Sequence, residues 1–223
     1  MAKNGNMMVV NESEIEAALV FYGIKEAREK TVKLRDYAAL VGEKRKWGNL
    51  TSSAWEREWP RAIVESITVA SVFRFEAELQ IADIGAGAGL LAFVLATISP
   101  QWKVTAIESA GRKATFMVEA AGKFGLLNLG VVNERAEKVA GRKQFSAVVS
   151  RAAGALKSMA PLAAPLLKRE GMYVALKGSR AVEEIAEARG AFSKYGFGKV
   201  DGIKPPFPDW ARERIVLVVA RKM

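Results

Sequence analysis

The chain has 223 residues, half of them apolar, so it can bury the core of one α/β domain with an N-terminal addition. It contains no Cys and no His, which excludes disulfides, thiolate nucleophiles, Ser-His-Asp triads and Cys/His zinc sites, and we expect no metal. A formal charge of +10 predicts attraction to a polyanion, most commonly ribosomal or other nucleic acid, although a generic basic surface stays open.

The first part of the chain has helical spacing. Apolar residues predict a helix from Glu12 that stops near Gly23, a second over Ala27–Val41 that ends at Gly42, and a third that Pro60 opens. We therefore predict a helical extension over residues 1–75, with a possible role in RNA binding.

Three cations lie beside an aromatic side chain after the second helix, namely Lys44, Arg45 and Lys46 before Trp47. Such a cluster can hold a single-stranded RNA backbone and stack a base. A solvated helix end with Trp47 packed beneath it explains the same pattern, and the sequence leaves both open.

From residue 76 onward, strand and helix patterns alternate. Strands are expected at 79–84, 103–107, 129–133, 145–150 and 172–177, and helices at 89–98, 110–124, 155–168 and 181–195. Two last β-rich pieces, around 197–203 and 214–221, have no helix between them. This order predicts an α/β, Rossmann-like fold with a mostly parallel seven-stranded sheet and an antiparallel C-terminal hairpin. No signal peptide or membrane span is expected, so we predict a cytoplasmic protein.

The most informative motif is Asp83-Ile84-Gly85-Ala86-Gly87-Ala88-Gly89, between a strand and a helix. Glycines let a ligand approach the backbone, and Asp83 would repel a phosphate but attract a cation. The pattern D-x-G-x-G-x-G resembles motif I of class I S-adenosylmethionine-dependent methyltransferases, although a turn without a cofactor stays open.

Glu108 ends the next strand, about 20 residues after the glycine loop. A carboxylate there can accept hydrogen bonds from both ribose hydroxyls of a nucleoside. A solvated Glu at a strand end is the alternative.

Several separated pieces together resemble one family, the bacterial small-subunit ribosomal RNA guanine-N7 methyltransferases, also called glucose-inhibited division protein B. The pieces are Trp47 with Asn49-Leu50-Thr51, the glycine loop, Arg112-Lys113 with Phe116, Arg135-Ala136-Glu137, Ser150-Arg151-Ala152, Pro165-Leu166-Leu167-Lys168, Lys177-Gly178, Glu183-Glu184 and Arg214. The resemblance implies S-adenosylmethionine as the cofactor, a small-subunit ribosomal RNA or particle as the partner, and transfer to guanine N7.

On this basis we predict three groups of site residues. The cofactor-binding group is Asp83, Gly85, Ala86, Gly87, Gly89, Leu90, Glu108, Ser109, Arg135, Ala136, Glu137 and Arg151. The catalytic group is Arg151 and Lys177, which we expect to grip phosphate or guanine O6, unless either pairs with a structural carboxylate. The RNA-binding group is Lys44, Arg45, Lys46, Arg61, Arg112, Lys113 and Arg214.

The chain departs from the family pattern at two places. Arg61-Ala62 and Glu65-Ser66 stand where the family often has Arg-His-x-x-Asp-Ser, and Leu91-Ala92 replaces Pro-Gly. A paralogue with a different RNA or small-molecule acceptor, and a non-catalytic RNA-binding protein of the same fold, therefore stay open. We expect a monomer.

Overall fold

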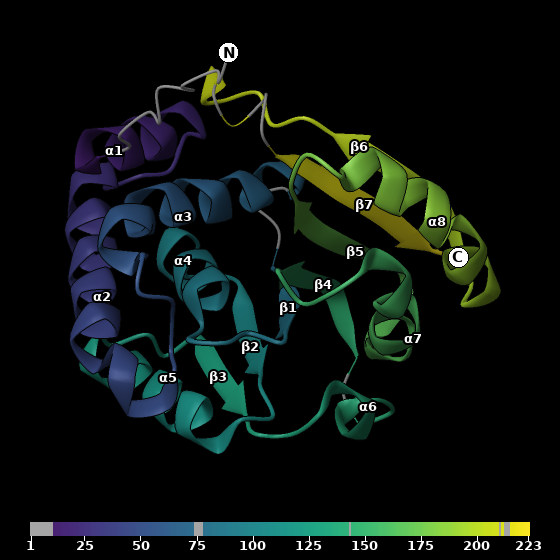
Figure 1. Cartoon of the computed structure of the whole chain (residues 1–223), viewed down its shortest axis with the longest axis horizontal. Helices are drawn as coiled ribbons and strands as arrows, with labels where there is room; N and C mark the ends of the chain where they lie inside the picture. The colour runs from purple at the N-terminus through teal and green to yellow at the C-terminus, as the bar shows by residue number, and fades with distance from the viewer. Residues whose placement is uncertain (1–10, 74–77, 143, 210, 212–214) are drawn as a thin grey trace, which may run out of the picture.

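The computed structural model describes residues 11–73, 78–142, 144–209, 211 and 215–223 (Figure 1). Within these residues seven strands form one sheet in the order β3-β2-β1-β4-β5-β7-β6. The strands are β1 (Gln80–Ile84), β2 (Lys103–Ile107), β3 (Leu129–Val132), β4 (Phe145–Arg151), β5 (Leu167–Lys177), β6 (Phe197–Ile203) and β7 (Val216–Lys222). Strands β1 to β5 pair in parallel, whereas β7 is antiparallel to both β5 and β6. The predicted mostly parallel sheet with an antiparallel C-terminal hairpin is confirmed.

Helices cover both faces of the sheet (Figure 1). They are α1 (Glu12–Phe21), α2 (Ala27–Gly48), α3 (Trp55–Val69), α4 (Leu90–Ile98), α5 (Gly111–Lys123), α6 (Ala136–Val139), α7 (Ala160–Ala163) and α8 (Ala181–Lys194), with short 3-10 turns η1 (Ala70–Val72), η2 (Leu156–Ser158) and η3 (Ala164–Leu166). Because successive strand residues point to opposite faces, Ile81 joins the core shared with α1 to α5, while Ala82 joins the core shared with α7 and α8. Strands buried on both faces are typical of this architecture.

The N-terminal helices share the first of these two cores. The ring of Tyr37 on α2 stacks on Phe93 of α4, with 3.8 Å between centroids, and its hydroxyl donates to the carbonyl of Ala88. Trp55 at the start of α3 donates its indole N–H to the carbonyl of Ala38 at 2.9 Å. Helix α2 therefore contacts the glycine loop directly.

Three helix boundaries differ from the sequence predictions. Helix α2 does not end at Gly42 but continues to Gly48, and a Cβ at Gly42 would lie 3.0 Å from Glu56 Oε1, so the glycine admits the start of α3. Helix α3 begins at Trp55 and contains Pro60 in its interior. The helix predicted over 155–168 is instead η2, α7 and η3, because Pro161 and Pro165 interrupt it and β5 begins at Leu167.

Candidate functional site

The glycine loop, residues 85–89, connects β1 to α4 at the carboxyl ends of the parallel strands. The N–H groups of Gly85 and Ala86 both donate to the carbonyl of Ile107, at 3.0 and 3.3 Å, which ties the loop to β2. Gly89 has φ +84°, and a Cβ there would lie 2.5 Å from Met117 Sδ. This position therefore requires glycine, and contacts within the protein itself hold the loop in place.

Glu108 follows β2 and faces the glycine loop. Its Oε2 accepts the N–H of Gly87 and its Oε1 accepts the N–H of Ala110, both at 2.8 Å. These two bonds fix the carboxylate and leave further lone pairs for a ligand's hydroxyl groups.

Beside Glu108 lies a cavity of about 170 Å³, here called the cofactor cavity. Six predicted cofactor-binding residues line it: Gly85, Glu108, Ser109, Arg135, Ala136 and Glu137. Six further lining residues were not predicted from the sequence: Ile84, Ile107, Glu134, Ala153, Met159 and Leu162. The strand ends could have indicated Ile84 and Ile107. Met159 follows η2 and Leu162 lies in α7, in a segment for which the sequence predicted one continuous helix. The cavity combines apolar walls with a fixed carboxylate, which suits a planar ring joined to a sugar.

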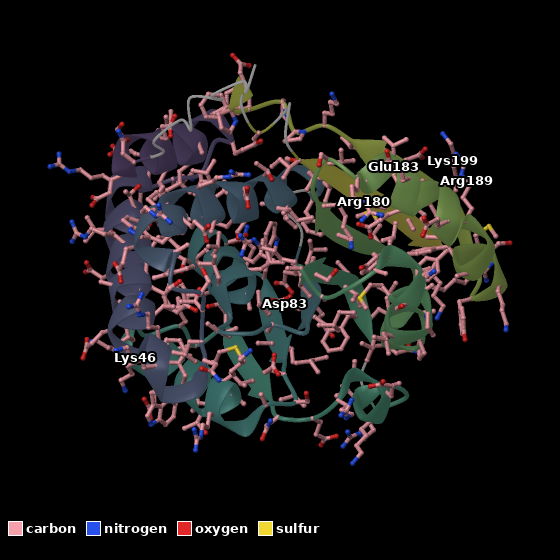
Figure 2. All side chains as sticks on the ribbon, in the orientation of Figure 1. Lys46, Asp83, Arg180, Glu183, Arg189 and Lys199 are labelled. Atoms are coloured by element: carbon pink, nitrogen blue, oxygen red, sulfur yellow. The ribbon has the colours of Figure 1, made fainter. Side chains whose placement is uncertain are left out.

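Asp83 lies in the interior at the end of β1 (Figure 2), with 2% of its surface exposed. Burial raises the pKa of its carboxyl to about 7, opposed by a hydrogen bond from the N–H of Ala92 at 3.2 Å and by the charge of Arg151. The negative charge of Glu108 adds to the rise. A nearby cation would favour the ionised form, so the site is suited to a positively charged ligand.

Arg151 ends β4, the strand next to β1, and belongs to a three-residue ion-pair network. Its Nη2 lies 3.2 Å from Glu65 Oε2, and Arg61 Nε donates to Glu65 Oε1 at 2.8 Å. The Glu65 side chain is only 9% exposed, and its charge is balanced by two guanidinium groups whose own side chains are 37% (Arg61) and 30% (Arg151) exposed. The Nε of Arg151 is also buried and has no hydrogen-bond partner among the described residues.

A second cavity, of about 290 Å³, opens beside this network and is here called the Arg151 cavity. It is lined by Thr51, Trp55, Glu58, Arg61, Ala62, Glu65 and Arg151. Two of the positions that depart from the family pattern, Ala62 and Glu65, therefore form its wall. No sequence pattern joins them to Arg151, because the two segments meet only in the folded chain.

Comparison with known proteins identifies the family to which the chain belongs. The chain matches the family described as GidB, rRNA small subunit methyltransferase G, over residues 30–201. A ribosomal RNA small subunit methyltransferase G of Staphylococcus haemolyticus is 31% identical over 205 residues, which cover 90% of this chain and 85% of the relative. Its counterpart in Sorangium cellulosum is 38% identical over 162 residues, 70% of this chain and 67% of the relative. The chain belongs to this family.

Solved structures agree with the family at the level of the fold. A methyltransferase from Pyrococcus furiosus superposes with a TM-score of 0.58 at 15% identity, over 72% of this chain and 82% of that one. Aeropyrum pernix fibrillarin, solved in complex with S-adenosyl-L-methionine, gives 0.55 at 13% identity, over 71% and 74% of the two chains. The predictions of the family, of a class I fold and of an S-adenosylmethionine-dependent methyltransferase are confirmed.

The residues at and beside the glycine loop fit S-adenosylmethionine as the cofactor. The fixed carboxylate of Glu108 suits ribose hydroxyls, the apolar wall with Ile107 and Met159 suits the adenine ring, and buried Asp83 suits a cation. Four other predicted residues, Ala86, Gly87, Gly89 and Leu90, lie in the loop and at the start of α4, outside the cavity lining.

Lys177 ends β5 and has surroundings different from those of Arg151. Its ammonium donates to Glu184 at 2.8 Å and to the carbonyl of Gly154 at 2.6 Å, and its side chain is 10% exposed. Burial acts to raise the pKa of Glu184, but the hydrogen bonds from Lys177 and from the N–H of Leu156 lower it overall. Both residues predicted as catalytic thus pair with carboxylates; Arg151 also lines the Arg151 cavity, whereas Lys177 lines neither of the two cavities described above.

The predicted RNA-binding cations divide into engaged and available side chains. Lys44 pairs with Glu119 at 2.9 Å, and Arg45 donates to the carbonyl of Ser53 at 3.3 Å. Lys46 and Arg112 are exposed and Lys113 is half-buried; Figure 2 shows Lys46 at the periphery of the molecule. Trp47 is 46% exposed, so it is not packed beneath the helix end. Arg61 joins the network at Glu65, and Arg214 lies outside the described residues.

Two further properties concern the described ranges only. They contain no cluster of His, Cys, Asp and Glu side chains that would hold a metal ion. None of their helices combines the length and the apolar character needed to cross a bilayer.

Proposed function

We propose that this methyltransferase transfers the methyl group of S-adenosylmethionine to N7 of a guanine in small-subunit ribosomal RNA. The observation that carries the proposal is that two cavities lie at the carboxyl ends of neighbouring strands, the cofactor cavity at the ends of β1 and β2 and the Arg151 cavity at the end of β4, which pairs with β1. The charge of Arg151 also acts on Asp83 at the end of β1. Relatives named ribosomal RNA small subunit methyltransferase G support the class of substrate.

Guanine N7 suits a chain without His and Cys. Its lone pair accepts the methyl group directly and no proton has to leave, so catalysis needs positioning rather than a general base. The bound cofactor supplies a methyl group activated on a sulfonium. Positive charge moves onto the purine during transfer, and hydrogen-bond acceptors beside the base stabilise it.

We assign the residues of the site as follows. Glu108 accepts hydrogen bonds from the ribose hydroxyls, and Asp83 in its ionised form attracts the cationic end of the cofactor. Arg151 touches the acceptor base by donating to guanine O6. Lys177 is a positioning residue, because its bonds to Glu184 and Gly154 fix the turn that follows β4.

The RNA contacts are assigned to exposed cations. We propose that the helices of residues 1–75 provide part of the RNA-binding surface through Lys46 and Trp47, and that Arg112 and Lys113 at the start of α5 extend it. Residues 76–223 carry the cofactor site. We also infer a monomer that acts in the cytoplasm, where its proposed ribosomal substrate is found.

Radiolabelled methyl transfer from S-adenosylmethionine tests the function. Small ribosomal subunits from a strain lacking the gene should accept one methyl group, subunits from the wild-type strain almost none, and large subunits none. Mass spectrometry of nuclease digests should then identify one 7-methylguanosine. Methylation of a different base would indicate a paralogue with another acceptor, and transfer to no ribosomal particle would contradict the proposal.

A further inference from the structure

One face of α3 forms a wall of the Arg151 cavity. Trp55, Glu58, Ala62 and Glu65 recur at intervals of three or four, so their side chains point to the same side of the helix. Arg151 reaches the same cavity from the end of β4. The charged cavity thus lies between α3 and the end of β4, the strand that pairs with β1.

The two carboxylates of this face differ in what they can still bind. Glu65 has one oxygen on Arg61 and the other on Arg151, so its charge is already neutralised. Glu58 is exposed, and within the described ranges no lysine or arginine pairs with it. Its one hydrogen bond there is from Ser52 Oγ at 3.4 Å. Glu58 therefore presents an available acceptor at the cavity.

The hydrogen-bond donors of the Arg151 guanidinium lie in the same cavity. The guanidinium of Arg151 keeps its buried Nε without a partner among the described residues, although its Nη2 is held by Glu65. The cavity is thus lined by a guanidinium, whose N–H groups donate, and by the Glu58 carboxylate, which keeps lone pairs beyond its one long bond from Ser52. Such a pair is complementary to a ligand edge that carries an acceptor followed by donors.

Guanine has such an edge. Its O6 accepts hydrogen bonds, and the neighbouring N1–H and N2–H groups donate them; adenine has the opposite order, a donor at N6 and an acceptor at N1. An enzyme that acts on a base within folded RNA must also take that base out of its stack and hold it in a cavity. We propose that the Arg151 cavity receives the flipped acceptor base and that Glu58 selects guanine by accepting the N1–H and N2–H groups.

This inference rests on the proposed function and adds a specificity-determining residue to it. Arg151 at O6 places N7, the neighbouring ring position, on the side away from Glu58. The Watson–Crick edge is thus read by α3 while N7 stays open to the cofactor side. An adenine in the same cavity would leave Glu58 facing N1, an acceptor against an acceptor.

The test compares guanine with inosine, which lacks the 2-amino group, at the mapped acceptor position of reconstituted small ribosomal subunits. For the wild-type protein we expect single-turnover transfer to inosine to be about 10-fold slower than to guanine. Glu58→Gln should slow transfer to guanine by about 10- to 100-fold and reduce the guanine-to-inosine ratio to below about 3. S-adenosylmethionine affinity and thermal stability should stay unchanged.

Glu56→Gln is the matched control. Glu56 is also an exposed acid in the first turn of α3, but it faces Gly42 of α2 and does not line the cavity. It should behave like the wild type in both rate and ratio.

Two results would overturn the inference alone: a wild-type protein that methylates guanine and inosine equally fast, or a Glu58→Gln protein that keeps the wild-type ratio. The first needs no variant, so it decides the question even if Glu58→Gln fails to fold. A wild-type protein that transfers nothing to guanine-containing subunits would instead refute the proposed function, and this inference with it.

Discussion

The buried carboxyl of Asp83 should make cofactor binding depend on pH in the physiological range. Burial raises its pKa to about 7, so the protein without ligand holds a mixture of neutral and ionised Asp83 near neutrality. A cationic cofactor binds the ionised form better. Affinity for S-adenosylmethionine should therefore increase as the pH rises through 7.

The size of the effect follows from the titration curve. With a pKa of about 7, the ionised fraction of Asp83 increases from roughly one tenth at pH 6 to roughly three quarters at pH 7.5. If only the ionised form binds, affinity should increase about eightfold over this range, which is about 1 kcal/mol.

The free energy of unfolding should change in the opposite direction. A raised pKa means that the folded protein keeps a proton that the unfolded chain has already released. The stabilising contribution of the neutral carboxyl is therefore complete below about pH 4 and is lost as the pH rises through about 7.

Isothermal titration calorimetry with S-adenosylmethionine at pH 6, 6.5, 7 and 7.5, at constant ionic strength, measures the prediction. Asp83→Asn is the control, since it has nearly the same shape and cannot ionise. The difference between the two proteins isolates Asp83 from titration of the ligand itself. Equal pH dependence of the two affinities, or a wild-type affinity that does not change with pH, would refute the reasoning.

Four further outcomes are expected. Arg151→Ala should lower single-turnover transfer by about 10- to 100-fold with little change in cofactor affinity, and Arg151→Lys should rescue it poorly because one ammonium cannot replace a planar guanidinium; wild-type rates would remove Arg151 from the acceptor site. Glu108→Ala should weaken S-adenosylmethionine binding by about 1.5 kcal/mol or more in calorimetry, and an unchanged affinity would leave Glu108 a solvated strand-end residue. Tyr37→Phe removes a buried hydrogen bond to the glycine loop, so denaturant titration should show a free energy of unfolding lower by about 1 kcal/mol, with weaker cofactor binding; equal stability would show that the bond contributes nothing. Lys46→Glu and Arg112→Glu should each reduce the slope of log K against log salt in filter binding, by about 0.7 for every RNA phosphate that the side chain no longer neutralises, while a constant slope would reassign these cations to solvent.

The sequence by itself determined the sheet, the glycine loop and the family. Apolar runs that end at Asp83 and Glu108 predict buried parallel strands whose carboxyl ends meet at one edge, because strand periodicity and glycine spacing are properties of short segments. The loop that Glu108 holds through the N–H of Gly87 is therefore readable from two short stretches of sequence. The absence of His and Cys likewise fixes the kind of chemistry, since no fold can supply a missing side chain.

Only the tertiary structure decided which side chains share a site across long stretches of chain. Glu65 and Arg151 are 86 positions apart and belong to a helix and a strand whose sequence patterns are independent, yet they form one network. Lys177 looked equivalent to Arg151 at the next strand end, and each pairs with a carboxylate, but the partner of Arg151 is on α3 beside a cavity and that of Lys177 is on α8. Pairing of this kind depends on how helices pack on the sheet, and packing is set by the volume and direction of many side chains at once rather than by the pattern of any one segment.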